Sequence, residues 1–236
     1  MKTVIHDTAD VIITNKATGE VVVNAEAQTV GFSQSVEETP LNGGIGNKKL
    51  YVIKSNKEIE LNMTSAFFDI GYLAAQQGVG VEADGTAVVT KHKKVTVASG
   101  KVEVPTGAEG DVTIISDKGQ EKVTPTGESA TVSPSIAADG ESVTLVYKEE
   151  VTGNKVEINA DNFGANYEVT YKTISYNPKT AEVYADVYYV FPNASISGTA
   201  DVSLTNGEAY APEVNFTVLS EDGESKLGEM IEVPRA

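Results

Sequence analysis

The sequence contains no cysteine and no tryptophan, and its 236 residues include only two histidines and one arginine, Arg235. Without cysteine the chain has neither a disulfide framework nor thiolate chemistry. His6 and His92 have no further histidine or paired carboxylate at metal-ligand spacing, which nearly excludes the usual metal sites and nucleophilic triads. We therefore expect a structural protein with no catalytic residues, no metal and no cofactor, rather than an enzyme.

Positive charge is also scarce. Eighteen Lys and Arg residues stand against 34 Asp and Glu residues, which gives a formal net charge of −16. Proteins that bind nucleic acids need clustered lysine and arginine to displace counterions and to contact bases and phosphates. The basic run at Lys91–Lys94 is more typical of a solvated strand edge. On average the chain should repel DNA.

Long hydrophobic runs are absent as well. No stretch of 18 apolar residues could span a bilayer, and the first seven residues lack the apolar core of a secretion signal. With 40% hydrophobic and 22% charged residues, the composition is that of a globular protein. We expect no membrane partner and assembly in a bacterial cytoplasm.

Most of the chain reads as short strands separated by turns. Val11–Ile13 and Val21–Val23 flank a turn with Gly19, a pattern that predicts a hairpin. Glu58 to Met63 alternates, so that Glu58 and Glu60 should face water. From Ala87 onward the β pattern is nearly continuous. The expected fold is mainly β, a sandwich or barrel with one flanking helix, as a single domain over residues 1–236.

One helix is predicted, over about residues 65–77. Thr64 or Ser65 can cap its start and Gly78 its end. Its candidate residues for packing or for contact with another subunit are Phe67, Phe68, Ile70, Tyr72 and Leu73.

Two other segments differ from ordinary surface strands. Residues 39–49 contain one proline and three glycines with little periodicity, which predicts a long loop that is mobile in the free subunit. The strand from Ala181 to Phe191 carries apolar residues on both faces, so it is either a core strand or faces a partner subunit.

The second half of the chain resembles the major tail tube proteins of long-tailed bacteriophages that infect Gram-positive bacteria. That family has a V-x-V-x-Y strand followed by an I-x-A-D-x-F stretch, and this chain has VTLVY at 143–147 and INADNF at 158–163. A strand over 167–175 follows, and then a long strand that ends in FPNA at 191–194. The resemblance covers about residues 138–219 and is loose elsewhere. Residues 101–138 do not align and are a candidate variable β insertion.

The resemblance implies a virion protein whose subunits form hexameric rings, stacked into a hollow tail tube through which double-stranded DNA passes. Its partners would be further copies of itself and the tape measure, terminator and distal tail proteins. The loop at 39–49 would bridge to a neighbouring ring or subunit through a set of seven residues: Pro40, Leu41, Gly43, Gly44, Ile45, Gly46 and Asn47.

An acidic lumen would suit such a tube, because it repels phosphate and lets the duplex slide without being held. The candidate lumen residues are Glu58, Glu60, Glu182 and Asp186. Which strands line the lumen stays open at this stage.

Three other functions are compatible with the composition. A surface-displayed Ig-like adhesin module would also be acidic, rich in Thr and Val, and free of cysteine, but it would need an export signal or sorting tail. The tube protein of a related contractile injection machine would share the fold without the DNA cargo. A carboxylate-based glycosidase is the least favoured, because sugar clefts commonly use flat aromatic platforms and tryptophan is absent.

Overall fold

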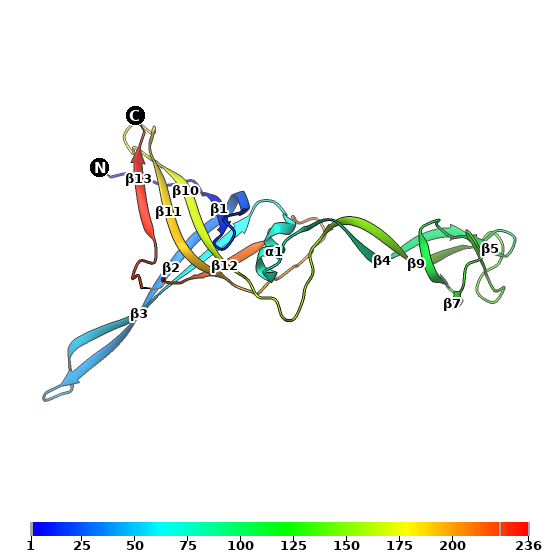
Figure 1. Ribbon diagram of the computed structural model, residues 1–236, viewed down its shortest axis with the longest axis horizontal. Coiled ribbons are helices and arrows are strands. Elements are labelled where there is room, and N and C mark those ends of the chain that lie inside the picture. Colours follow the sequence, from blue (N-terminus) through cyan, green and yellow to red (C-terminus); the bar gives the residue numbers. More distant parts are fainter. Residues whose placement is uncertain (1, 222, 236) are drawn as a thin grey trace. The chain divides into compact units, whose positions relative to one another are not determined.

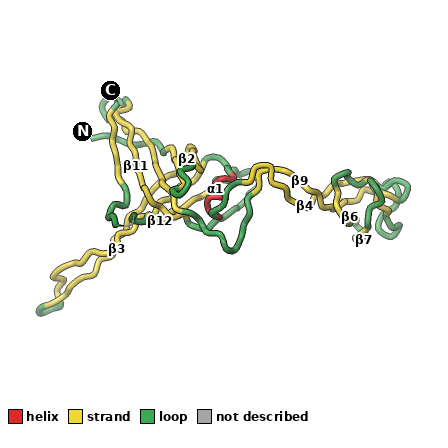
Figure 2. The backbone as a smooth tube through the Cα atoms, viewed as in Figure 1, coloured by secondary structure: helices red, strands yellow, loops and turns green. Residues whose placement is uncertain are grey.

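The structure, a computed structural model, describes residues 2–221 and 223–235. The chain divides into two compact units: unit 1 comprises Met1–Val81 and Val156–Ala236, and unit 2 comprises Glu82–Lys155. Antiparallel strands dominate both units, and the one helix that the structure describes lies in unit 1 (Figures 1 and 2). The prediction of a mainly β fold with one flanking helix is confirmed.

Unit 1 is built from seven strands and the helix. In chain order these are β1 (Asp10–Asn15), β2 (Val21–Gly43), β3 (Lys48–Ser65), α1 (Ile70–Gln77), β10 (Asn166–Tyr176), β11 (Val183–Ile196), β12 (Glu213–Val218) and β13 (Glu229–Pro234). They pair in the order β10-β1-β2-β3-β12-β11-β13, and β10 also pairs with β11. That last pairing closes six of the strands into a barrel, and β13 lies beside β11 over residues 229–234.

Alternation places the core of unit 1 inside this barrel. On β3, Ile59, Leu61 and Met63 are buried while Glu58 and Glu60 are exposed, as the sequence predicts. The same period-2 pattern brings Tyr171 of β10 and Phe216 of β12 into one apolar cluster. The predicted hairpin at the start of the chain is also confirmed, with β1 paired to β2 and Gly19 at φ 72°.

The helix is shorter than predicted. It begins at Ile70, and its N-cap is Asp69, whose side chain accepts a hydrogen bond of 2.8 Å from the backbone N–H of Gly71. Ser65, predicted as the cap, still belongs to β3, where it pairs with Ala27 of β2 and its N–H donates to the Pro212 carbonyl. The end is as predicted, since Gly78 adopts a left-handed conformation at φ 66°.

The predicted long loop at residues 39–49 is wrong. Pro40, Leu41 and Gly43 belong to β2, Lys48 and Lys49 belong to β3, and only the four residues 44–47 form a turn. β2 and β3 continue here as a two-stranded ribbon in which Pro40 faces Val52. A proline is tolerated in such a ribbon because each strand has one unpaired edge, so the missing N–H can point to solvent.

Later parts of unit 1 also differ from the sequence pattern. The β pattern that the sequence shows after Ala87 continues through residues 156–158 and 195–204, but residues 156–158 form no strand and β11 ends at Ile196. The strand β13 was not predicted. The helix α1 has eight residues, and no helix in the described residues is long and apolar enough to cross a bilayer.

Unit 2 has a core of its own. Its strands are β4 (Glu82–Thr96), β5 (Lys101–Glu103), β6 (Ala108–Ser116), β7 (Gly119–Val123), β8 (Ser129–Thr131) and β9 (Ser142–Lys155). They form a four-stranded sheet in the order β4-β9-β6-β7 and a small β5-β8 pair. Val112, Ile114 and Leu145 are fully buried between them. Residues 101–138 lie inside this unit, and their variability among relatives stays a prediction.

No linker composition marks the limits of unit 2. The chain enters it at Glu82 and leaves it at Lys155, and these two residues are partners in the β4-β9 ladder. A unit entered and left through one strand pair needs no proline- or glycine-rich connector, which is why the sequence indicated none.

Candidate assembly surfaces

The part of the β2-β3 hairpin beyond the barrel is the first candidate surface. Here, residues 34–57 are called the arm. β1 pairs with β2 only as far as Glu26, and β12 pairs with β3 only as far as Glu60, so the arm strands pair with each other alone. Figure 1 shows this part extending away from the other strands of unit 1. No residue of the arm is buried.

Large apolar side chains are nevertheless frequent on the arm. Its exposed apolar residues are Val36, Leu41, Ile45, Leu50, Tyr51 and Ile53. Ile45 in the turn is 99% exposed. Leu41 lies opposite Tyr51, and Ile53 lies on the same face, so these three form an exposed apolar group. Such a group marks an interaction surface more often than a solvated one.

The turn at the arm tip is held by backbone geometry. Gly44, Gly46 and Asn47 have φ values of 75°, 86° and 49°, and the N–H of Asn47 donates to the Gly44 carbonyl at 3.2 Å. Glycine is the residue that adopts these positive values without strain. The glycines that suggested a flexible loop therefore serve a tight turn. That the segment is mobile in the free subunit stays a prediction.

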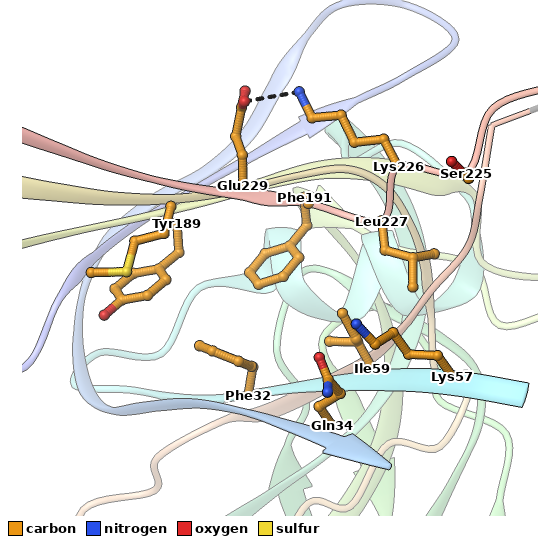
Figure 3. A pocket seen from close by; sticks show the side chains of 12 residues that line it. Phe32, Gln34, Lys57, Ile59, Tyr189, Phe191, Ser225, Lys226, Leu227 and Glu229 are labelled. Atoms are coloured by element: carbon orange, nitrogen blue, oxygen red, sulfur yellow. Dashed lines mark ion pairs between the residues drawn. The ribbon is translucent and has the colours of Figure 1, made fainter. Parts of the chain in front are cut away.

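A groove of about 380 Å³ lies at the base of the arm, where it meets β11 and the segment before β13 (Figure 3). Phe32, Tyr189 and Phe191 form its aromatic side, with ring centroids 5.6 to 5.8 Å from Phe32. Lys226 and Glu229 form an ion pair of 2.9 Å at its rim, and Lys57 lies on the opposite side.

The outer surface of β2, β3 and β12 is the second candidate surface. At the positions opposite the core, the register brings together side chains that are small, polar or acidic. We call this set the polar face: Thr29, Gly31, Ser33, Ser35, Glu58, Glu60, Asn62, Thr64, Glu213, Asn215 and Thr217. Its three charged residues are all glutamates, and none is basic.

The polar face is also closely fitted. Asn62 lies over Gly31, where a Cβ atom would come within 2.8 Å of the Asn62 side-chain oxygen. Any larger residue in place of Gly31 would displace Asn62. The sequence analysis found Glu58 and Glu60 but missed Glu213, although the alternation in β12 is a signal that could have found it.

The four predicted lumen residues do not share one surface. Glu58 and Glu60 lie two residues apart on the polar face. Glu182 is exposed in the segment before β11, which begins at Val183, and Asp186 lies on the outer side of β11.

Asp186 is engaged by the one arginine. Arg235 donates two hydrogen bonds to its carboxylate, from Nε at 3.0 Å and from Nη2 at 2.7 Å. The guanidinium holds the pKa of Asp186 below its usual range and raises the pKa of Arg235. The pair fastens the C-terminal end to β11, and its charge is internally compensated.

The predicted helix residues divide into two groups. Tyr72 is buried in the core of unit 1, where burial raises the pKa of its hydroxyl, and Ile70 and Leu73 are half-buried. Phe67 and Phe68 precede α1 and are 67% and 66% exposed. Phe68 contacts the ring of Tyr210, with centroids 6.0 Å apart. The helix itself thus packs on the barrel, and the open apolar area lies just before it.

Within the described ranges, no three His, Asp or Glu side chains are grouped so that they could hold a metal ion.

Comparison with known proteins gives full-length matches. The chain matches the YomU/Tube protein family over residues 3–233. It is 42% identical to the "Tail tube protein" of Bacillus phage SPR over 239 residues, covering 100% of this chain and 90% of that relative. It is 35% identical over 236 residues to the "SPbeta prophage-derived uncharacterized protein YomU" of Bacillus subtilis (strain 168), covering 99% of this chain and 88% of that relative.

Proposed function

Because this chain belongs to the YomU/Tube protein family, we propose that it is a phage tail tube subunit whose copies form hexameric rings. The rings stack into a hollow tube that conducts double-stranded DNA. The protein is then a component of the virion tail, assembled in the cytoplasm of the host bacterium. Its partners would be further copies of itself and the tape measure, terminator and distal tail proteins.

The polar face is the observation that supports a conduit best. Three adjacent strands present only small, polar or acidic side chains on the side away from the core. A surface that carries glutamates and no lysine repels phosphate and releases no counterions to DNA, so the duplex can slide. We place this face toward the lumen, with Glu58, Glu60 and Glu213 as its negative charges.

Charge is distributed in accordance with this role. Unit 2 contains 12 acidic and 8 basic residues, a net charge of −4, which leaves −12 of the total −16 in unit 1. The acidic excess therefore belongs to the unit that carries the polar face.

The arm and the residues before α1 are the proposed contacts between copies. The arm is too long and too exposed to be stabilised within one subunit, because an isolated two-stranded ribbon is marginal in water. Contacts that repeat around a closed ring and along its axis would cover it, together with Phe67 and Phe68.

Assembly can be tested by electron microscopy of the purified protein at high concentration. We expect rings of six subunits and hollow tubes. Monomers that persist under all conditions of salt and concentration would contradict the proposal and favour a surface-displayed β-module instead.

The lumen assignment can be tested with charge reversal on assembled tubes. Glu58→Lys with Glu60→Lys should convert tubes that do not retain DNA into tubes that bind it, with an affinity that falls steeply as salt rises. The matched control is Glu182→Lys with Glu208→Lys, which makes the same change in net charge at exposed positions outside the three strands of the polar face. Equal DNA retention by both variants would refute the assignment.

A further inference from the structure

One end of unit 1 carries the arm, and the opposite end carries a pocket. β3 pairs with β2 in a ladder that spans the whole length of β3. At the arm tip Gly43 lies opposite Lys48, and at the far end Ala27 lies opposite Ser65. At about 3.3 Å per residue, the tip and the far end of this ladder are about 50 Å apart. The two features therefore cannot meet within one molecule.

The pocket at the far end, here called the end pocket, has a volume of about 440 Å³. Ala9, Ala27 and Ala66 form an apolar floor, fixed by hydrogen bonds from the Ala27 N–H to the Ala9 carbonyl and from the Ala66 N–H to the Glu26 carbonyl. Small floor residues leave room for a larger apolar side chain.

The rim of the end pocket is acidic on one side. Asp10 and Glu26 are direct cross-strand partners, and within the described part of the chain neither has an ion-pair partner. Like charges placed directly opposite each other are destabilising, and a cation between them would relieve the repulsion.

The other charged groups that line the end pocket are already engaged or lie to one side. Asp7 accepts a hydrogen bond from the Tyr176 hydroxyl and contacts His6, and Arg235 is bound to Asp186. Lys172 faces Asp10 across the β1-β10 ladder. Two carboxylates and one lysine therefore leave a net negative rim.

The arm tip has complementary properties. Ile45 is a fully exposed apolar side chain of the size that the floor accommodates, and Lys48 and Lys49 follow it at once. Neither lysine forms an ion pair with a described residue, whereas Glu37 and Glu38 of the arm are engaged by Asn56 and Lys54. The arm tip therefore has a net positive charge and an exposed apolar side chain, Ile45, in its turn.

From this complementarity we infer that the arm tip of one copy docks into the end pocket of the next, with Ile45 on the alanine floor and Lys48 and Lys49 against Asp10 and Glu26. The inference rests on the proposed stacking of rings and gives it a specific contact. The contact is heterologous, and because tip and pocket lie at opposite ends it propagates along one axis.

The groove at the base of the arm does not compete for this role. It lies at the same end as the arm, because Gln34 and Lys57 of the arm line it. Lys226 is paired with Glu229 there, so Lys57 is the lysine that would repel Lys48 and Lys49.

Cysteine cross-linking tests the contact directly, since the chain has no cysteine of its own. Ile45→Cys combined with Ala66→Cys should give a ladder of covalent oligomers on mild oxidation, because a disulfide requires Cα atoms within about 7 Å. Ile45→Cys with Met230→Cys, which places the second thiol in the groove at the arm base, is the matched control. An absent ladder, or equal ladders from both variants, would overturn the inference.

Charge exchange gives an independent test. Lys48→Glu with Lys49→Glu should raise the concentration needed for tubes at least tenfold, and Asp10→Lys with Glu26→Lys should do the same. The four substitutions in one chain should restore tubes, because the exchanged charges again match. Lys93→Glu with Lys94→Glu, exposed lysines of β4, controls for net charge.

The outcomes separate the two levels of the proposal. If the unaltered protein forms neither rings nor tubes, the proposed function fails. If it forms tubes but the exchanged chain does not recover them while remaining folded by circular dichroism, only the docking contact is wrong.

Discussion

The two halves of the β2-β3 hairpin share one continuous ladder but differ completely in burial. Near the barrel, Ile59, Leu61 and Met63 alternate with exposed polar residues and fill the core. On the arm the ladder continues and apolar residues such as Leu50 and Ile53 persist, yet none of them is covered. Strand pairing alone does not decide what a residue contributes. The covering surface decides it, and for the arm that surface belongs to another molecule in the proposed assembly.

The largest expected effect contrasts the same residue type in the two halves. Leu61→Ala, at a position only 1% exposed, should lower the free energy of unfolding by about 2–5 kcal/mol. Leu50→Ala, at a position 65% exposed, should change it by less than about 0.5 kcal/mol but weaken assembly. Denaturant titration measures the free energy of unfolding of each variant, and electron microscopy shows whether each variant assembles. Equal loss of stability in the two variants would show that the arm is covered within the subunit.

A comparable loss of stability is expected when a buried residue of unit 2 is truncated, because unit 2 has a hydrophobic core of its own. Ile114→Ala removes a fully buried side chain and should cost about 2–5 kcal/mol. Because unit 2 is a compact unit with its own cluster, hydrogen exchange should accelerate in β4 to β9 and stay unchanged in β3 and β12. Faster exchange throughout the chain would mean that the two cores unfold as one.

A smaller effect is expected at the turn that ends the arm. Gly46→Ala adds a Cβ that meets no atom within 4 Å, so its cost arises from the positive φ of 86° and should be about 1–2 kcal/mol of local stability. Hydrogen exchange at the arm tip should accelerate while the barrel is unaffected. Gly198→Ala is the control, since that glycine also has open space but no positive φ. Unchanged exchange at the tip would show that the turn adapts.

The smallest effect concerns the fastening of β13 by Asp186 and Arg235. Because Arg235 lowers the pKa of Asp186, the stabilisation is fully present above the ordinary carboxyl pKa of about 4 and is lost as pH falls through the lowered value. Hydrogen exchange of the β13 amides, corrected for intrinsic rates, should be constant from pH 5 to 7 and accelerate only in stronger acid. Arg235→Gln should remove this pH dependence. If the pH dependence persists in the Arg235→Gln variant, it arises from another carboxylate.

Family membership confirms two predictions made from residues and resemblance. The ordered segments between 138 and 219 indicated a tail tube protein, and the chain belongs to the YomU/Tube protein family over nearly its full length. The expectation of a structural protein rather than an enzyme is confirmed by that family. The hexameric ring, the lumen and the other tail proteins as partners stay proposals.

Local patterns predicted local structure well. The alternation from Glu58 to Met63 located the buried face of β3, and Gly78 located the end of α1. The arm was missed because proline and glycine are common in loops, and no local signal distinguishes a loop from a ribbon whose partner strand also has a free edge. The helix start was missed because Ser65 pairs with Ala27 and hydrogen-bonds to Pro212, both distant in sequence, and so remains in β3.

By itself the sequence determined the class of the protein. The lack of cysteine, the two isolated histidines, the single arginine and the strand alternation follow from residue identity and spacing, and they leave little for catalysis or DNA readout. Only the tertiary structure decided which acidic residues act together. Glu58 and Glu60 join Glu213 because β3 pairs with β12. Asp186 lies on β11, outside that set, and is paired with Arg235, 49 residues away. Register and long-range pairing are set by the closure of the barrel, which no local pattern specifies.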